Sequence, residues 1–228
     1  GDFLLGSSTV LQLVVGQAGI QNTGDSGGGG GGSFVVAPGN VPLIIAGGGG
    51  GTRTSVLQNG CDAFTSMFGG TGSGSATAWG CGQKGGGAGF GGIVSSSSWG
   101  SAGAGFLGNG ASDCAGIGGR SWASGMLGGT SSRGDAGGFG GGGAGAGCAG
   151  GGGGGGYSGG DGGRIAGGGG SYNTGFNTLS FAGVGFGDGA ITIELLSGGP
   201  SPTPIPGVFS LMLGGLAGLT VFGRRRRG

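Results

Sequence analysis

The stretch GGGGGGSFVVAPGNVPLIIAGGGGGTR, residues 27–53, decides the fold because it places a hairpin between two glycine blocks. The runs SFVV at residues 33–36 and VPLIIA at residues 41–46 are apolar and β-branched, which favours buried strands. Between them, Ala37-Pro38-Gly39-Asn40 has the composition and length of a hairpin turn. The sequence therefore predicts an antiparallel strand pair that is entered and left through polyglycine.

Glycine supplies 78 of the 228 residues, in blocks rather than at every third position, and there are only six prolines. This distribution excludes collagen, which needs a strict triplet repeat and abundant proline. Ordering so many glycines costs on the order of 100 kcal/mol of backbone entropy. Backbone hydrogen bonds and close backbone packing must offset this cost, as in an array of extended three-fold glycine helices bonded laterally. The alternative is disorder.

Two further segments predict strands. The run STVLQLVV at residues 8–15 is apolar and β-branched. The run AITIELL at residues 190–196 alternates apolar and polar side chains, as a half-buried strand does. Helix signals are lacking before residue 207. We expect a mainly β module with glycine blocks between its strands.

Charge and composition exclude several functions. The chain has no His and a single Lys, and ahead of its terminal arginines it holds five basic and eight acidic residues, a net charge of −3. No nucleic-acid footprint is expected from such a surface. We expect a protein that is not an enzyme and has no cofactor or metal. Asp161 and Asp188 lie in glycine turns, where a turn role is favoured over a calcium site.

The four cysteines are widely spaced and form no C-x-x-C pair. An even count without His favours disulfides in an oxidising compartment over a zinc site. Four cysteines allow three connectivities. We favour Cys61–Cys81 and Cys114–Cys148, each worth roughly 3–4 kcal/mol in the chain-entropy model. Free thiols in a reducing cytosol are the alternative.

The order of strand, glycine block, hairpin, block, Cys-containing block and final strand resembles the glycine-rich extracellular domain of the anaplastic lymphoma kinase and leukocyte tyrosine kinase receptors. The matching stretches are residues 11–19, 27–53, 137–160 and 187–196. The resemblance covers residues 1–196. It implies a small β-sandwich of the tumour-necrosis-factor type with an inserted bundle of polyglycine-II helices. It also implies that the first strands and a signal peptide precede Gly1.

The C-terminal residues form three parts. Residues 197–207 are a Pro-rich spacer, residues 208–223 are a predicted transmembrane helix, and residues 224–228 carry an arginine cluster. An uncharged run followed at once by arginines is typical of a membrane stop with the positive side inside. Its fifteen-residue apolar core spans about 22 Å as a helix, short of the roughly 30 Å hydrocarbon layer. Such a short span suits a segment that is inserted, recognised and removed.

This end resembles the PEP-CTERM sorting signal of Gram-negative bacteria, which exosortase-type proteases process. The residues that carry the resemblance are Pro204, Pro206, Arg224, Arg225, Arg226 and Arg227. Isoleucine stands where the family motif has Glu. The resemblance implies an exported protein that passes through the inner membrane to the outer envelope, cell surface or extracellular matrix. Its expected partners are the membrane, the protease, and an exopolysaccharide or surface protein.

The aromatic residues leave two interpretations open. Trp79, Trp99 and Trp122 pack against the glycine bundle or contact a glycan. The function we expect is that of a structural or adhesive protein of the cell surface or exopolysaccharide matrix. A binding module for a protein or glycan partner and an ice-binding protein are the alternatives.

Overall fold

The structure, a computed structural model, describes residues 1–21, 26–53, 59–73, 81–83, 85–94, 100–113, 116–145 and 150–196. The chain divides into two compact units, Gly1–Ile191 and Thr192–Gly228. Of the second unit, only residues 192–196 are described. The sheet, the core and the candidate site all belong to the first unit.

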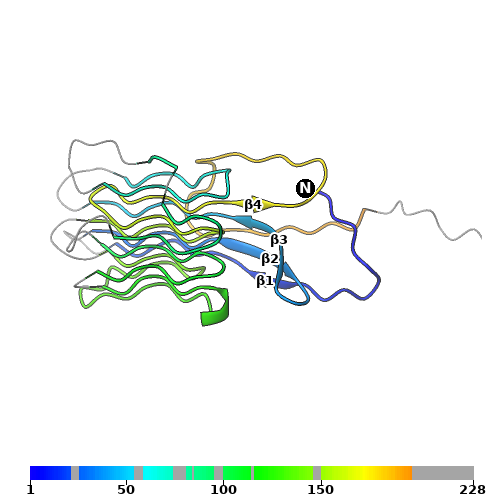
Figure 1. Cartoon of the computed structure of the whole chain (residues 1–228), viewed down its shortest axis with the longest axis horizontal. Coiled ribbons are helices and arrows are strands. Elements are labelled where there is room, and N and C mark those ends of the chain that lie inside the picture. Colours follow the sequence, from blue (N-terminus) through cyan, green and yellow to red (C-terminus); the bar gives the residue numbers. More distant parts are fainter. Residues whose placement is uncertain are drawn as a thin grey trace, which may run out of the picture. The chain divides into compact units, whose positions relative to one another are not determined.

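One antiparallel sheet of four strands organises the first unit, with the spatial order β1-β2-β3-β4 (Figure 1). The described residues contain almost no helix, so the prediction of a mainly β protein is confirmed. A single 3-10 turn, η1, spans Trp122–Ser124. The strands are β1 Gln12–Val14, β2 Ser33–Ala37, β3 Val41–Ala46 and β4 Tyr172–Asn173.

The predicted hairpin is confirmed. Ala37 at the end of β2 pairs with Val41 at the start of β3. The intervening turn needs left-handed backbone at Gly39 (φ 78°) and Asn40 (φ 59°), the two residue types that adopt it most easily. Pro42 has no N–H group that could donate to a neighbouring strand. The pairing with β4 does not need one there, because β4 pairs only with Ile44 and Ile45 of β3.

Two strand predictions need correction. The run at residues 8–15 forms a strand only at Gln12–Val14, because Ser8 adopts a positive φ of 64° in a turn. Residues 190–196 form no strand. The amide of Gly189 donates to the carbonyl of Gly16 at 2.8 Å, but the compact unit ends at Ile191. The alternation of apolar and polar side chains at residues 190–196 therefore occurs in a segment that pairs with no strand among the described residues.

The core lies on one face of the sheet. Cross-strand pairing aligns Val14, Phe34, Ile45 and Tyr172 in one row. Phe34 and Ile45 are fully buried, and this row packs with a cluster contributed by the loops: Phe106, Trp122, Met126, Phe139 and Tyr157.

The expected sandwich of two sheets is not what the described residues form, since they contain this single sheet. The loop cluster, rather than a second sheet, covers the core face. The row on the opposite face, Leu13, Val35 and Ile44, is apolar, and Leu13 remains 49% exposed. The hydrophobic pattern of β2 therefore indicated burial but not which layer provides it.

The glycine blocks run side by side and bond laterally through their backbones (Figure 1). In residues 151–156 each amide donates to one of three neighbouring segments, and the choice repeats every three residues. The donor–acceptor pairs are Gly151 with Gly163 and Gly154 with Gly167; Gly152 with Gly27 and Gly155 with Gly30; Gly153 with Ser101 and Gly156 with Ala104. Three residues per turn is the period of an extended left-handed helix.

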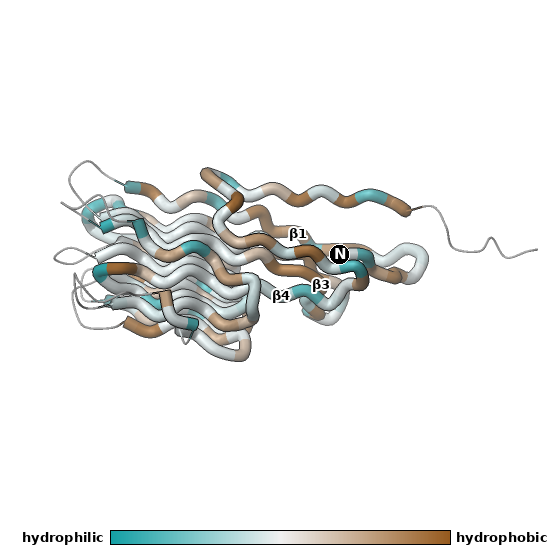
Figure 2. The backbone as a smooth tube through the Cα atoms, turned by 90° about the horizontal axis from the view of Figure 1, so that it is seen from above, coloured by the Kyte–Doolittle hydropathy of each residue, from teal (hydrophilic) through white to brown (hydrophobic). Residues whose placement is uncertain are grey.

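The block at residues 27–32 repeats this pattern. Its amides bond in turn to three antiparallel segments: Thr52 and Gly49, Ile20 and Gln17, and Gly143 and Gly140. Side-chain-free backbone makes this array nearly white in a hydropathy colouring, whereas β1 and β3 include strongly apolar stretches (Figure 2). Backbone hydrogen bonding, not side-chain burial, therefore holds this half of the unit together.

The C-terminal predictions fall on residues that the structure does not describe. The Pro-rich spacer, the predicted transmembrane helix and the arginine cluster all lie outside the described residues. Within the described part of the chain, no helix has the length and apolarity needed to cross a bilayer.

Candidate interaction surface

The glycine segments reverse direction beside the sheet (Figure 1). Aromatic residues from several of these segments, Phe106, Trp122, Phe139 and Tyr157, pack with the core. Backbone hydrogen bonds tie these reversals together: the amide of Phe106 donates to the carbonyl of Tyr157, and that of Trp122 donates to the carbonyl of Phe106. Tyr157 also stacks on Tyr172 of β4 with ring centroids 4.4 Å apart. The turns of the array and the sheet thus share one aromatic layer.

The inner part of this layer is packing. The Trp122 ring lies 5.5 Å from Phe106 and 6.1 Å from Phe34, centroid to centroid. Its indole Nε1 donates to Oδ1 of Asn40 in the hairpin turn at 3.0 Å. Trp122 is partly buried and packs against the core cluster.

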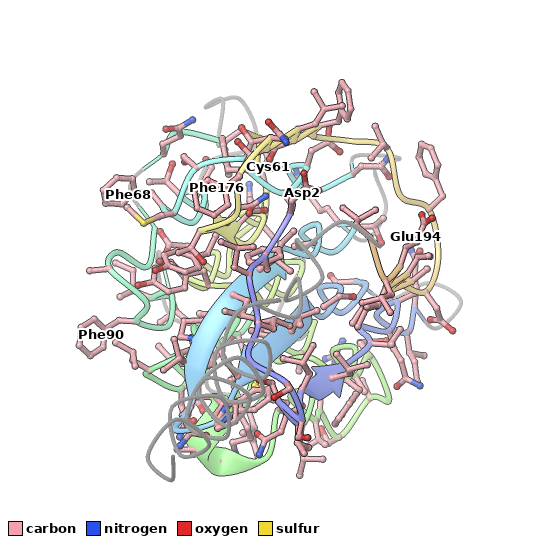
Figure 3. The ribbon with its side chains drawn as sticks, turned by 90° about the vertical axis from the view of Figure 1, so that its right-hand side faces the viewer. Asp2, Cys61, Phe68, Phe90, Phe176 and Glu194 are labelled. Carbon is pink, nitrogen blue, oxygen red and sulfur yellow. A yellow bond between two sulfur atoms is a disulfide. The ribbon has the colours of Figure 1, made fainter. Side chains whose placement is uncertain are left out.

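The outer part of the layer faces solvent, and we call it the rim: Met67, Phe68, Phe90 and Leu107. Their exposed fractions are 47, 46, 58 and 58%. Phe68 and Phe90 project from the same side of the molecule, away from the ribbon (Figure 3). Clustered apolar side chains that remain exposed on a folded protein mark an interaction site.

A buried hydroxyl fixes two of the rim turns relative to each other. Ser158 is fully buried, and its Oγ accepts from the amide of Gly89 at 3.0 Å and donates to the carbonyl of Met67 at 2.5 Å. The turn that carries Phe90 requires left-handed backbone at Ala88 and Gly89, with φ of 51° and 90°. Ser158 thereby joins the turn before Phe68 to the turn before Phe90.

A disulfide joins the same two segments at their far end. Cys61 and Cys81 are bonded, with Cα atoms 5.4 Å apart, as the sequence predicted. Between the disulfide and the rim, residues 69–71 pair with residues 81–86 through four backbone hydrogen bonds of 2.6–3.1 Å. The rim therefore sits on two glycine-rich segments that are paired through their backbones and cross-linked by a disulfide.

The side chain of Asp161 holds two further segments together, those that contain Gly72 and Ile93. Its side chain is 4% exposed, and its carboxylate accepts from the amides of Ile93 at 2.8 Å and Gly72 at 3.3 Å. Burial raises the pKa of the Asp161 carboxyl above its ordinary value of 3.8, while the two hydrogen bonds act in the opposite direction. Asp188 likewise accepts from the amide of Ala18 at 2.9 Å. Both aspartates accept hydrogen bonds from backbone amides of distant segments.

In the ranges that the structure describes, no three His, Cys, Asp or Glu residues gather in one place. Neither aspartate is among the described residues with a positive φ, so the structure shows them bonding to amides far away in the sequence instead of making a local turn.

Most residues named from the sequence lie outside the described residues: Trp79, Trp99, Cys114, Cys148, Pro204, Pro206, Arg224, Arg225, Arg226 and Arg227. The pairing of Cys114 with Cys148 therefore stays a prediction. Sequence reasoning missed Phe68 and Met67 as surface residues. The signal that could have found them is the recurrence of a bulky residue wherever a glycine segment turns.

No protein-family model matches the chain, and comparison with curated proteins finds no significant match.

Proposed function

We propose that the protein is a secreted, non-enzymatic structural or adhesive protein of the cell surface or exopolysaccharide matrix. The observation that carries this proposal is the exposed rim on a scaffold of laterally bonded glycine segments. A scaffold whose backbone groups are paired on several sides presents its rim without large ordering costs on binding.

The glycine array is, in this proposal, a bundle of polyglycine-II helices. Its support is the three-residue period of the hydrogen bonds in residues 27–32 and 151–156. Residues 1–196 then form a module of the type found outside the cell in the anaplastic lymphoma kinase and leukocyte tyrosine kinase receptors. The hairpin between two glycine blocks supports this likeness.

The route to the surface rests on residues 197–228. We propose that the spacer, apolar segment and arginine cluster form a PEP-CTERM-type signal, with the apolar segment as a transmembrane helix in the inner membrane and an exosortase-type protease as partner. The disulfide between Cys61 and Cys81 fits an oxidising compartment outside the cytoplasm.

A second candidate function is an extracellular binding module for a protein partner. The exposed Met67 together with Phe68 and Phe90 favours it, because methionine and aromatic side chains are enriched at protein interfaces.

The test is fractionation of a Gram-negative host that has an exosortase and expresses the full chain. We expect the protein at the cell surface, with a measured mass that lacks Arg224–Arg227, and cells that retain more matrix polysaccharide than cells without it. Replacing Pro204 and Pro206 by Ala should leave an unprocessed form in the inner membrane. Recovery of an intact chain from the cytoplasm, with no change in the matrix, would contradict the proposal.

A further inference from the structure

Strand β1 forms one side of the sheet (Figure 1). Among the described residues it pairs with β2 alone. Apart from that ladder, no backbone hydrogen bond between described residues involves residues 10–15. The outer backbone N–H and C=O groups of β1 are therefore available to pair with another strand.

Strand β4, at the opposite side of the sheet, offers no comparable edge. It is two residues long, and the chain pairs with itself directly after it. There the amides of Asp2 and Phe176 each donate to the carbonyl of the other, at 2.8 and 2.9 Å. Asp2 also brings a carboxylate, which accepts from Nδ2 of Asn177 at 2.8 Å. The sheet can therefore be extended at β1 rather than at β4.

Strand β1 lacks the features that usually protect an exposed edge. Native edge strands carry charged side chains or proline, which oppose pairing with other chains. Residues 3–21 contain no Asp, Glu, Lys, Arg or Pro. The exposed fractions of Val10, Leu13 and Val15 are 73, 49 and 42%. The run VLQLVV at residues 10–15 thus has the composition of segments that pair with copies of themselves.

This edge is complementary to itself. In an antiparallel pair of two β1 strands centred on Leu13, Leu13 lies opposite its copy and Leu11 lies opposite Val15, all on one face of the sheet. That face carries the apolar row Leu13, Val35 and Ile44, which would continue into the same row of the second copy. No like charges meet in this register, because residues 3–21 have none. A second copy of the chain therefore matches the edge in both apolar pattern and charge.

We propose that β1 is a self-association site, at which two copies of the chain pair their β1 strands antiparallel about Leu13. The two four-stranded sheets then form one continuous sheet. The contact uses the same surface on both copies, so it closes as a two-fold dimer. A single strand pair is a small interface, and dimerisation should depend on protein concentration. This inference goes beyond the proposed function and depends neither on the rim nor on the route of export.

The first test is analytical ultracentrifugation of the full chain over a range of concentrations. A mild detergent is included so that the apolar residues 208–223 do not drive association. We expect a reversible dimer of the parent. Leu13→Lys places like charges directly opposite each other and should weaken dimerisation on the order of tenfold or more. Leu13→Thr, which is β-branched and uncharged, is the matched control and should weaken it less.

The second test is cross-linking, which examines the register. In the proposed pair the Cβ atoms of the two copies of Leu13 lie about 4.5–5.5 Å apart, close to the separation that a disulfide needs. Leu13→Cys should therefore give a disulfide-linked dimer when it is oxidised with copper phenanthroline. Gln17→Cys, also at an exposed position, should not, because the two copies of Gln17 would lie about 26 Å apart along the strands.

Several results would overturn the inference. They are a parent that stays monomeric at every concentration, equal dimerisation of Leu13→Lys and the parent, and cross-linking of Gln17→Cys as readily as of Leu13→Cys. Slow exchange of every amide in residues 10–15 of a monomeric parent would assign the edge to a strand of the same chain. Circular dichroism of each variant separates loss of association from loss of fold. A processed protein at the cell surface together with any of these results would leave the proposed function standing.

Discussion

Replacing Gly29 by Ala should destabilise the protein, whereas replacing the adjacent Gly30 by Ala should not. A methyl group at Gly29 would overlap the carbonyl oxygen of Gly153, far inside the 3.0 Å below which real Cβ atoms essentially never approach backbone. At Gly30 the nearest atom, the amide nitrogen of Gly49, lies 3.5 Å away, an ordinary contact. Neither residue has a positive φ, so space alone distinguishes them.

The magnitude follows from the bonds that must yield. To admit a methyl group at Gly29, the block at residues 151–156 must move away, which strains its bonds from Gly152 to Gly27 (3.0 Å) and from Gly155 to Gly30 (2.9 Å). Each lost backbone bond costs about 1 kcal/mol, and overpacking adds about 1–3 kcal/mol. We expect Gly29→Ala to lower the free energy of unfolding by roughly 3–5 kcal/mol. Gly30→Ala should be neutral or raise it by about 0.5 kcal/mol through the unfolded state.

Thermal unfolding followed by far-UV circular dichroism is the assay, with the full chain and both variants side by side. A loss of about 3 kcal/mol corresponds to a fall in Tm of roughly 6–12 °C for a chain of this size. If the two variants unfold at the same temperature as the parent, residues 27–32 are a linker without close neighbours and the reasoning fails.

Three further changes test particular contacts. Replacing Cys61 and Cys81 together by Ala should lower the free energy of unfolding by about 2–4 kcal/mol, measured by urea titration beside the parent, and an unchanged midpoint would contradict the role of this disulfide. Trp122→Phe should cost about 1 kcal/mol by losing the bond to Asn40, whereas Trp122→Ala should cost about 3–5 kcal/mol, and equal effects would argue against a packed ring. Because the pKa of Asp161 is raised in the folded state, stability should fall as pH rises from 3.8 through that raised pKa, and Asp161→Asn should flatten this slope in a pH series of unfolding curves.

The hairpin could be predicted from sequence because its information is local. Pro38, Gly39 and Asn40 dictate the turn, and the apolar runs on either side dictate the strands. The pair Cys61–Cys81 was also within reach, since it is close in sequence and other cysteines are distant. The hairpin and this disulfide were therefore predicted correctly from residues that lie close together in the sequence.

The rest of the fold depends on packing contacts and hydrogen bonds between segments that lie far apart in the sequence. Which segment covers Phe34 is set by loops at Phe106 and Trp122, and glycine blocks carry no side-chain signal that specifies their neighbours. Alternation at residues 190–196 gave no strand because a strand needs a ladder partner as well as a pattern. The rim could not be predicted from the sequence for the same reason. Whether Phe68 is exposed depends on where the glycine segments turn in space, which its sequence neighbours do not determine.

Native-state hydrogen exchange at the glycine amides tests most directly the claim that the glycine blocks form an ordered, laterally bonded array. Every amide in residues 28–31 and 152–155 donates to a backbone carbonyl of another segment. These amides should exchange on the order of 10³-fold or more slowly than in an unstructured peptide, with protection similar to that of β2 and β3. Exchange of the block amides at the unstructured rate, while β2 and β3 stay protected, would contradict the account.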